Sequence, residues 1–369
     1  ESLRVGQRLA PDSPRELGAR EMSRESRDGR EGRDLLGYAL QATVRTGEGP
    51  PAPKGPEVNT AVIEGARRKT EPHVAIELSQ TRARFVLSGG FVVPQGTELR
   101  ARVDHYGHLV LWPGELTYRI AEPGALRALL GERRMDVAPL SRAEVRLGGD
   151  GARRLNLSTR RVDVSTRAAK GSLELATVRD AGDGAVLVCR FLLDLMNAPP
   201  STAPCATDEI PLHAELRWTT QGALTFDVTS IVRRNDLAPA DLAGPPASAA
   251  FESAAPTAES AELLVSRAEL AAFRSGPVDV PQTAPRDAQA PLPETGLTLV
   301  NWTDELRLVW IDGVAVAWVG PGKRVTLASL VRGRYSLEWR TFLGDSWEPP
   351  VTVIAPGVSE VGVADVATR

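Results

Sequence analysis

Tryptophans are concentrated in the last third of this chain. Five of the seven lie between Trp302 and Trp347, within stretches that alternate apolar and polar residues and are separated by turn residues. A period of two is typical of β-strands with one buried face, and aromatic side chains are enriched in strands. The pattern therefore predicts a small β-sandwich over residues 293–369, of the kind that holds a partner.

The clearest turn in this region is Asp312-Gly313, a dipeptide that favours a two-residue hairpin turn. With such a turn, Val309 faces Val316 across the hairpin and Arg307 faces Trp318. The spacing therefore predicts a cation–π contact between Arg307 and Trp318.

Several short motifs in the same region resemble a known family. They are Ile311-Asp312-Gly313, Gly320-Pro321-Gly322, Leu330 and Gly333-Arg334-Tyr335-Ser336-Leu337. Together they resemble a PEGA-type surface module over about 70 residues. The resemblance implies a small carrier β-sandwich of a bacterial envelope protein, without enzymatic activity and attached to other domains.

The middle of the chain, residues 71–234, also alternates over many short segments separated by turn residues. Many short strands with few helices predict a second sandwich-like or barrel domain. Residues 187–198 fit either a helix or a strand. The segments on either side of Gln221-Gly222 are predicted to pair as a hairpin.

The remaining segments favour little regular structure. Residues 1–70 carry many charges and few large apolar side chains, which predicts a flexible arm with a short helix at 34–46. A helix docked on the next domain is the alternative. Residues 235–292 are rich in Ala and Pro, which predicts an extended linker with a helix at 257–274. The fold class is thus mainly β, with two sandwich-like domains.

The two cysteines carry information about the cellular compartment of the protein. Cys189 and Cys205 could form a disulfide in an exporting bacterium, or remain buried thiols in a cytosol. We predict the disulfide. The chain begins at Glu1, compatible with removal of a leader, and no apolar run is long enough to span a membrane. These features predict a periplasmic, cell-surface or secreted protein.

Charge excludes one class of partner. The net charge is only −3, so we expect no nucleic-acid binding through a basic field. Only four of the 44 basic residues are lysine. Together with the abundance of Ala, Pro and Gly, this bias indicates a GC-rich bacterial genome rather than phosphate recognition.

Motifs for catalysis are missing from the sequence. It has no nucleophile elbow, phosphate loop or dinucleotide fingerprint, so we expect no cofactor and no enzymatic activity. His213 shares a predicted strand face with Glu215 and Arg217 and is expected to be solvated rather than a catalytic base. The candidate metal ligands are His105 and His108, which would oppose each other across a two-residue turn. The alternative for that pair is a solvated hairpin tip.

The aromatic residues of the last third allow two interpretations. Most of them, including Trp339, are expected to pack in the core. The functional alternative is an exposed platform for a sugar ring or a partner protein, formed by Trp302, Trp318, Trp347 and Arg307. Trp347 lies in a predicted loop and is the best candidate.

These observations favour a non-enzymatic structural or interaction protein whose C-terminal module docks on an envelope protein or a glycan. Two alternatives remain open. One is a carbohydrate-active hydrolase, in which the central domain is catalytic and the module is an accessory binder. The other is a subunit of a surface fibre or sheath that self-assembles through strand edges.

Overall fold

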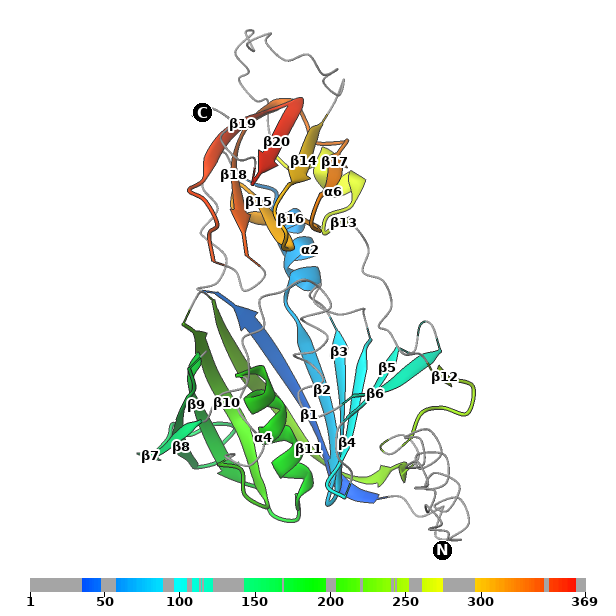
Figure 1. Cartoon of the computed structure of the whole chain (residues 1–369), viewed down its shortest axis with the longest axis vertical. Coiled ribbons are helices and arrows are strands. Elements are labelled where there is room, and N and C mark those ends of the chain that lie inside the picture. Colours follow the sequence, from blue (N-terminus) through cyan, green and yellow to red (C-terminus); the bar gives the residue numbers. More distant parts are fainter. Residues whose placement is uncertain are drawn as a thin grey trace, which may run out of the picture.

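The computed structural model of the chain describes residues 35–47, 58–88, 96–104, 108–112, 114, 116–121, 143–167, 169–196, 204–219, 222–239, 242, 244–251, 261–274, 296–341 and 345–362. The fold is mainly β, as the alternation predicts. In Figure 1 one large sheet forms the lower part of the molecule and two smaller sheets form the upper part.

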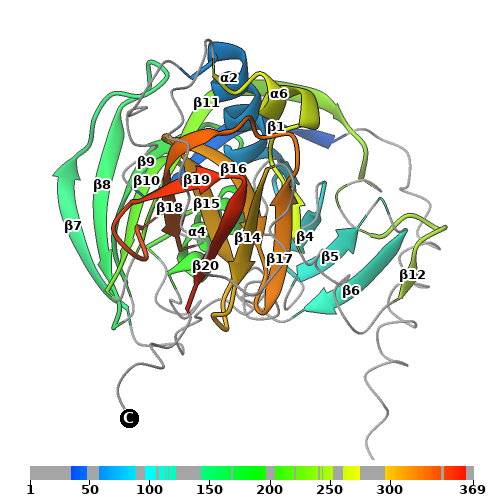
Figure 2. The ribbon, with the colours of Figure 1, turned by 90° about the horizontal axis from the view of Figure 1, so that it is seen from above.

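The large sheet contains twelve strands. Their bounds are β1 (Leu35–Thr46), β2 (His73–Ser79), β3 (Arg82–Ser88), β4 (Glu98–Arg102), β5 (His108–Trp112), β6 (Thr117–Ala121), β7 (Glu144–Asp150), β8 (Thr159–Ser165), β9 (Ala169–Thr177), β10 (Glu209–Trp218), β11 (Ala223–Leu237) and β12 (Ala250–Phe251). The strand order is β12-β6-β5-β4-β3-β2-β1-β11-β10-β9-β8-β7. Two meanders, β1–β6 and β7–β11, therefore meet where β1 pairs with β11. Figure 2 shows that the sheet is strongly curved.

Strand β1 corrects the prediction for the N-terminal part of the chain. Residues 35–46 form neither a flexible arm nor a helix, but a strand at the centre of the sheet, between β2 and β11. Every second side chain is buried, namely Tyr38, Leu40, Ala42 and Val44. This alternation indicates a strand. Its position in the sheet could not be predicted, because β11, the longer of its two partners, begins almost 190 residues further along the chain. Residues 1–34 lie outside the described residues.

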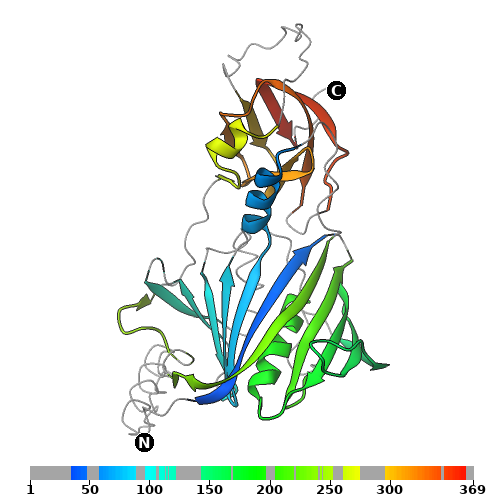
Figure 3. The same ribbon diagram turned by 180° about the vertical axis from the view of Figure 1, so that it is seen from behind.

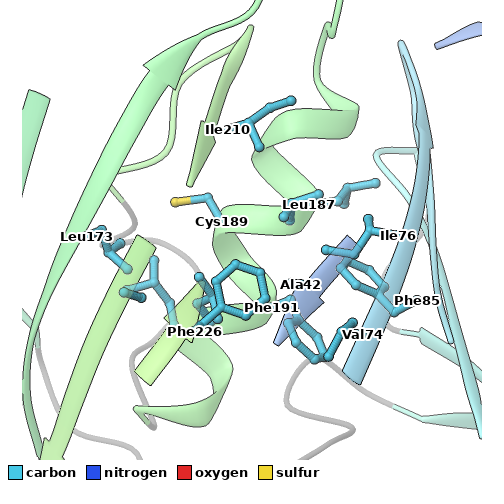
Figure 4. Packing of buried hydrophobic residues seen from close by; sticks show 14 of the residues in the cluster. Ala42, Val74, Ile76, Phe85, Leu173, Leu187, Cys189, Phe191, Ile210 and Phe226 are labelled. Atoms are coloured by element: carbon cyan, nitrogen blue, oxygen red, sulfur yellow. The ribbon is translucent and has the colours of Figure 1, made fainter. Parts of the chain in front are cut away.

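One face of the large sheet is covered by helix α4 (Gly184–Leu195), within the segment whose sequence fits either helix or strand (Figures 1 and 3). Leu187, Cys189 and Phe191 point from this helix into a core formed with both meanders (Figure 4). The ring of Phe191 stacks on that of Phe85, with 4.5 Å between the centroids. The helix begins at Gly184, where a Cβ would lie 1.9 Å from the carbonyl oxygen of Ser79, so only glycine fits.

The central domain is therefore not a sandwich of two sheets. The expected second layer is replaced by α4, nine of whose residues are buried. A single apolar helix supplies the cover that one face of the sheet needs, while the opposite face carries polar side chains.

The upper part of the molecule is a β-sandwich, as predicted. Its five-stranded sheet has the order β13-β16-β15-β18-β19, and its three-stranded sheet has the order β17-β14-β20. The bounds are β13 (Ala261–Leu263), β14 (Leu297–Asn301), β15 (Arg307–Ile311), β16 (Val314–Val319), β17 (Lys323–Leu327), β18 (Gly333–Arg340), β19 (Val351–Ala355) and β20 (Gly357–Val361). Both sheets contribute to one core, which contains Leu299, Val309 and Trp339.

Two segments from outside residues 293–369 complete this module. Helix α2 (Thr60–Thr70) places Val62 and Ala66 in the module core, although its sequence lies between two strands of the large sheet. The short helix α6 (Arg267–Ala271) follows β13 and contributes Leu270. The predicted linker helix is thus much shorter than residues 257–274. The chain passes from the large sheet to the module and back before β2, so the two parts are interleaved.

On the face of the large sheet away from α4, a buried carboxylate links two arginines. Glu98 accepts hydrogen bonds from Arg84 (Nη2 to Oε1, 2.6 Å) and from Arg100 (Nη2 to Oε2, 2.7 Å). Burial alone would raise the pKa of Glu98, but the hydrogen bonds from these guanidinium groups outweigh it and lower the pKa below its ordinary value of 4.5. Glu98 therefore stabilises the fold in its charged form.

This arrangement predicts a pH dependence of stability. A carboxyl group with a depressed pKa in the folded state contributes stability above its unfolded pKa, and this contribution is lost as the pH falls through the folded value. We expect the melting temperature of the wild type to fall more steeply below about pH 4.5 than that of Glu98→Gln. Glu64→Gln, which changes an exposed carboxylate on α2, should follow the wild type. Parallel curves for all three proteins would contradict this assignment.

Candidate functional site

One end of the C-terminal sandwich is organised by a buried asparagine, Asn301, at the end of β14. Its Nδ2 donates hydrogen bonds to the carbonyl oxygens of Glu305 (2.8 Å) and Val319 (2.9 Å). Its Oδ1 accepts from the backbone N–H and the hydroxyl of Thr303, at 2.9 and 2.7 Å. Two segments of this end, the connection from β14 to β15 and the end of β16, are thereby fixed by one side chain.

Trp302 lies on this fixed turn. Its backbone N–H donates to the carbonyl oxygen of Val361 at 2.9 Å, which ties the residue to β20. Its side chain is 55% exposed, although its backbone is held on both sides. The structure thus presents a large apolar ring to solvent from a rigid position.

Trp347 lies at the same end, in the connection from β18 to β19. Its backbone N–H donates to the carbonyl oxygen of Trp339, and its side chain is 41% exposed. The guanidinium of Arg307 lies against its ring, with Cζ 3.8 Å from the centroid. Arg307 itself is only 1% exposed, and its Nη1 donates to Glu305 Oε2 at 2.7 Å. The indole of Trp347 therefore rests on a cation whose own position is fixed.

The predicted contact between Arg307 and Trp318 is wrong, because the hairpin contains a β-bulge. Ile311 pairs with Val314 as expected, but Val309 pairs with Ala317 rather than with Val316. The extra residue reverses the orientation of the strand beyond it. Arg307 consequently faces Val319, on the side of the module core.

Trp318 is displaced by the same bulge to the outer face of the five-stranded sheet. It is only 3% exposed there, in a small apolar cluster with Leu264, Leu306, Leu308 and Ala315. Of the four predicted binding residues, the structure thus brings Trp302, Trp347 and Arg307 to one end and places Trp318 in a packed cluster. Trp339 is buried in the core, as expected.

A charge cluster on the large sheet was missed by the sequence analysis. His213, expected to be solvated, is buried, and its Nδ1 lies 2.6 Å from Asp227 Oδ1. Asp227 Oδ2 also accepts from Arg45 at 2.9 Å, and Arg154 approaches from the turn before β8. Burial alone would raise the pKa of Asp227, but its contacts with His213 and Arg45 lower it. The contact depends on the register of β10 and β11, in which His213 lies directly opposite Asp227.

The metal candidates remain untested. His105 and the side chain of His108 lie outside the described residues. Among the residues that are described, no group of three or more His, Cys, Asp or Glu side chains could hold a metal ion. None of the described helices has the length and hydrophobicity of a membrane-spanning segment.

The predicted disulfide is present and joins Cys189 in α4 to Cys205, which precedes β10. It fixes the covering helix to the sheet beneath it. Such bonds persist in oxidising compartments.

A comparison with protein-family models found no match to this chain, and a comparison with curated proteins found no significant similarity.

Proposed function

We propose that this chain is a non-enzymatic structural or interaction protein of the bacterial cell envelope, or a secreted one. In this proposal its C-terminal sandwich docks on a partner protein or a glycan. The observation that carries the proposal is the pair of exposed indoles, Trp302 and Trp347, at one end of the module. Large aromatic side chains dominate the energetics of binding surfaces and stack well on sugar rings.

The rigidity of this end supports binding. A side chain that is already immobilised loses little conformational entropy when a ligand binds, so more of the interaction energy appears as affinity. The ring of Trp347 is held on Arg307, and the backbone of Trp302 is held by β20 and by the turn that Asn301 organises. Both rings keep an exposed surface for a ligand.

Further features support the location and the type of module. The disulfide between Cys189 and Cys205 suits an oxidising compartment outside the cytoplasm. The sandwich of two small sheets suits the PEGA-type resemblance of Gly320-Pro321-Gly322 and the neighbouring motifs, which implies an envelope carrier module.

This proposal is tested by binding of the full chain to purified bacterial sacculi, a glycan array and solubilised envelope proteins. We expect Trp347→Ala and Trp302→Ala each to weaken the retained interaction about tenfold or more, as expected for an aromatic anchor. Val358→Ala, which shortens another exposed apolar side chain of the module, should bind like the wild type. Equal binding by all three variants would exclude this end as the docking surface.

The hydrolase alternative has one observation in its favour. An open groove on the large sheet is lined by Glu144, Asp163 and Glu215 among others. A general acid in glycoside hydrolysis needs desolvation to raise its pKa, whereas the side chains of Glu144 and Glu215 are 71% and 69% exposed. This exposure favours binding over catalysis. Sugar release from the retained glycan that Glu215→Gln abolishes would establish the enzyme instead.

The assembly alternative rests on strand β7, which forms one edge of the large sheet and is exposed along its whole length. Exposed edges can pair with a second copy. Its charged side chains and a bulge near Gly149 oppose such pairing. Light scattering that gives a monomer mass at all concentrations would exclude a fibre subunit, whereas filaments would exclude the monomeric docking protein proposed above.

A further inference from the structure

The polar face of the large sheet carries an open groove with a volume of about 700 Å³, lined by residues of β7 to β11 and by Gly47, which follows β1. Lys170 on β9 and Arg217 on β10 lie in it and are directly opposite each other in the antiparallel pairing. Their neighbours in the same row are small, because Ser165 faces Lys170 from β8 and Ala223 faces Arg217 from β11. These small side chains therefore leave the space beside the two exposed cations, Lys170 and Arg217, unfilled.

Like charges that face each other across two strands destabilise a sheet. Most other arginines on this face are compensated, and in the groove itself Arg161 pairs with Asp163 at 3.0 Å and Arg146 with Glu144 at 3.9 Å. Within the described part of the chain, no carboxylate forms an ion pair with Lys170 or Arg217. Glu215, two residues from Arg217 on the same face, lies instead 3.7 Å from the imidazole of His213.

The same sheet shows how such a pair is normally compensated. Arg84 on β3 and Arg100 on β4 are also directly opposite each other. There the carboxylate of Glu98 lies between them and accepts hydrogen bonds from both guanidinium groups. At Lys170 and Arg217 the corresponding position is open to the groove rather than filled by a side chain.

We propose that Lys170 and Arg217 bind an oxyanion, a carboxylate or a phosphate, carried by a hydroxyl-rich ligand such as a sugar acid or a sugar phosphate. The planar guanidinium of Arg217 can donate two parallel hydrogen bonds to such a group, and the ammonium of Lys170 adds a point charge. In this arrangement the ligand supplies the negative charge that Glu98 supplies to the other pair.

The other residues that line the groove limit which ligands can bind there. Ser165, Ser172 and Thr225 offer hydroxyl groups, while Asp163 and Glu215 offer carboxylates that accept hydrogen bonds. These carboxylates repel closely spaced anionic groups, so a polyanion such as nucleic acid is disfavoured. A single anionic group surrounded by hydroxyls satisfies both kinds of side chain. This inference does not depend on the docking function, because the groove belongs to the large sheet and not to the tryptophan-bearing module.

The test is isothermal titration calorimetry of the full chain with inorganic phosphate and with glucuronate, at fixed ionic strength in a chloride buffer. Glucose serves as the uncharged partner of glucuronate. We expect saturable binding of phosphate, of glucuronate or of both, and none of glucose. Whichever anion binds more tightly distinguishes a phosphate ligand from a carboxylate ligand.

Two variants locate the site. Lys170→Gln and Arg217→Gln should each weaken anion binding at least tenfold, whereas Arg179→Gln, at an exposed position outside the groove, should bind like the wild type. In chloride buffer Lys170→Gln should melt at the same temperature as the wild type or higher, because it removes a like-charge contact; this also verifies that it folds. The proposal is overturned if the wild type shows no saturable binding, or if all three variants lose affinity equally.

Discussion

Asp312→Ala should destabilise the C-terminal module by about 3–5 kcal/mol, the cost of leaving a buried charge without its partner. Asp312 lies in the turn between β15 and β16, and its side chain is almost completely buried. Its Oδ2 accepts from Nε of Arg274 at 3.0 Å, and its Oδ1 accepts from the backbone N–H of Ser336 at 2.8 Å. One carboxylate thus joins the hairpin turn, β18 and the segment after α6.

Removal of this carboxylate would leave the buried guanidinium of Arg274 without its ion-pair partner. Its guanidinium is nearly buried and lies over the ring of Tyr335, with Cζ 4.2 Å from the centroid. Asp312 also has a φ of 47°, a conformation that asparagine and aspartate tolerate better than alanine does.

Asp312→Asn is therefore the matched control, because it retains the side-chain shape and the tolerance of positive φ but removes the charge. Urea denaturation followed by tryptophan fluorescence reports this module, which holds five of the seven tryptophans. We expect Asp312→Asn to lie between the wild type and Asp312→Ala. If Asp312→Ala unfolded at the same urea concentration as the wild type, the ion pair would have no role in stability.

The second large effect concerns the disulfide. The double variant Cys189→Ala/Cys205→Ala should lose about 3 kcal/mol, because the bond closes a loop across a sequence separation of 16. The effect should extend to the whole large sheet, since α4 is its only described cover on that face and carries Leu187, Phe191 and Leu192 into the core.

The measurement is the denaturation midpoint of the oxidised wild type, the reduced wild type and the double variant. Reduction should lower the midpoint to about that of the variant, and air oxidation should restore it in the wild type alone. Midpoints that do not differ between the oxidised and reduced proteins would show that α4 is held by packing alone.

Local patterns made much of the C-terminal module predictable. The turn at Asp312-Gly313 and the buried face that carries Trp339 depend on neighbours within a few residues. The bulge at Val316 could not be predicted from such local patterns. The carbonyl of Val316 accepts a hydrogen bond from Leu264, which lies about 50 residues earlier in the chain. Because the bulge decides where Arg307 and Trp318 point, the geometry of the site could not be predicted either.

Long-range pairing limited the prediction of the large sheet. The alternation from Tyr38 to Val44 indicates a strand, but its central position depends on β11, almost 190 residues further along. That Lys170 and Arg217 lie opposite each other could not be predicted either, because α4 separates their strands in the sequence. The contact between His213 and Asp227 lies within one hairpin, but it depends on the register of β10 and β11, which places His213 directly opposite Asp227.

The most direct test of the docking function is ¹⁹F NMR of the full chain labelled with 5-fluorotryptophan, titrated with the probe that retains the wild type in the binding screen. Seven resonances are expected, and Trp302→Ala and Trp347→Ala assign two of them. The proposal predicts that the resonances of Trp302 and Trp347 shift on binding, while the five other resonances, which include that of the buried Trp339, shift less. A probe that shifts other tryptophans and leaves these two unchanged would contradict docking through this end of the module.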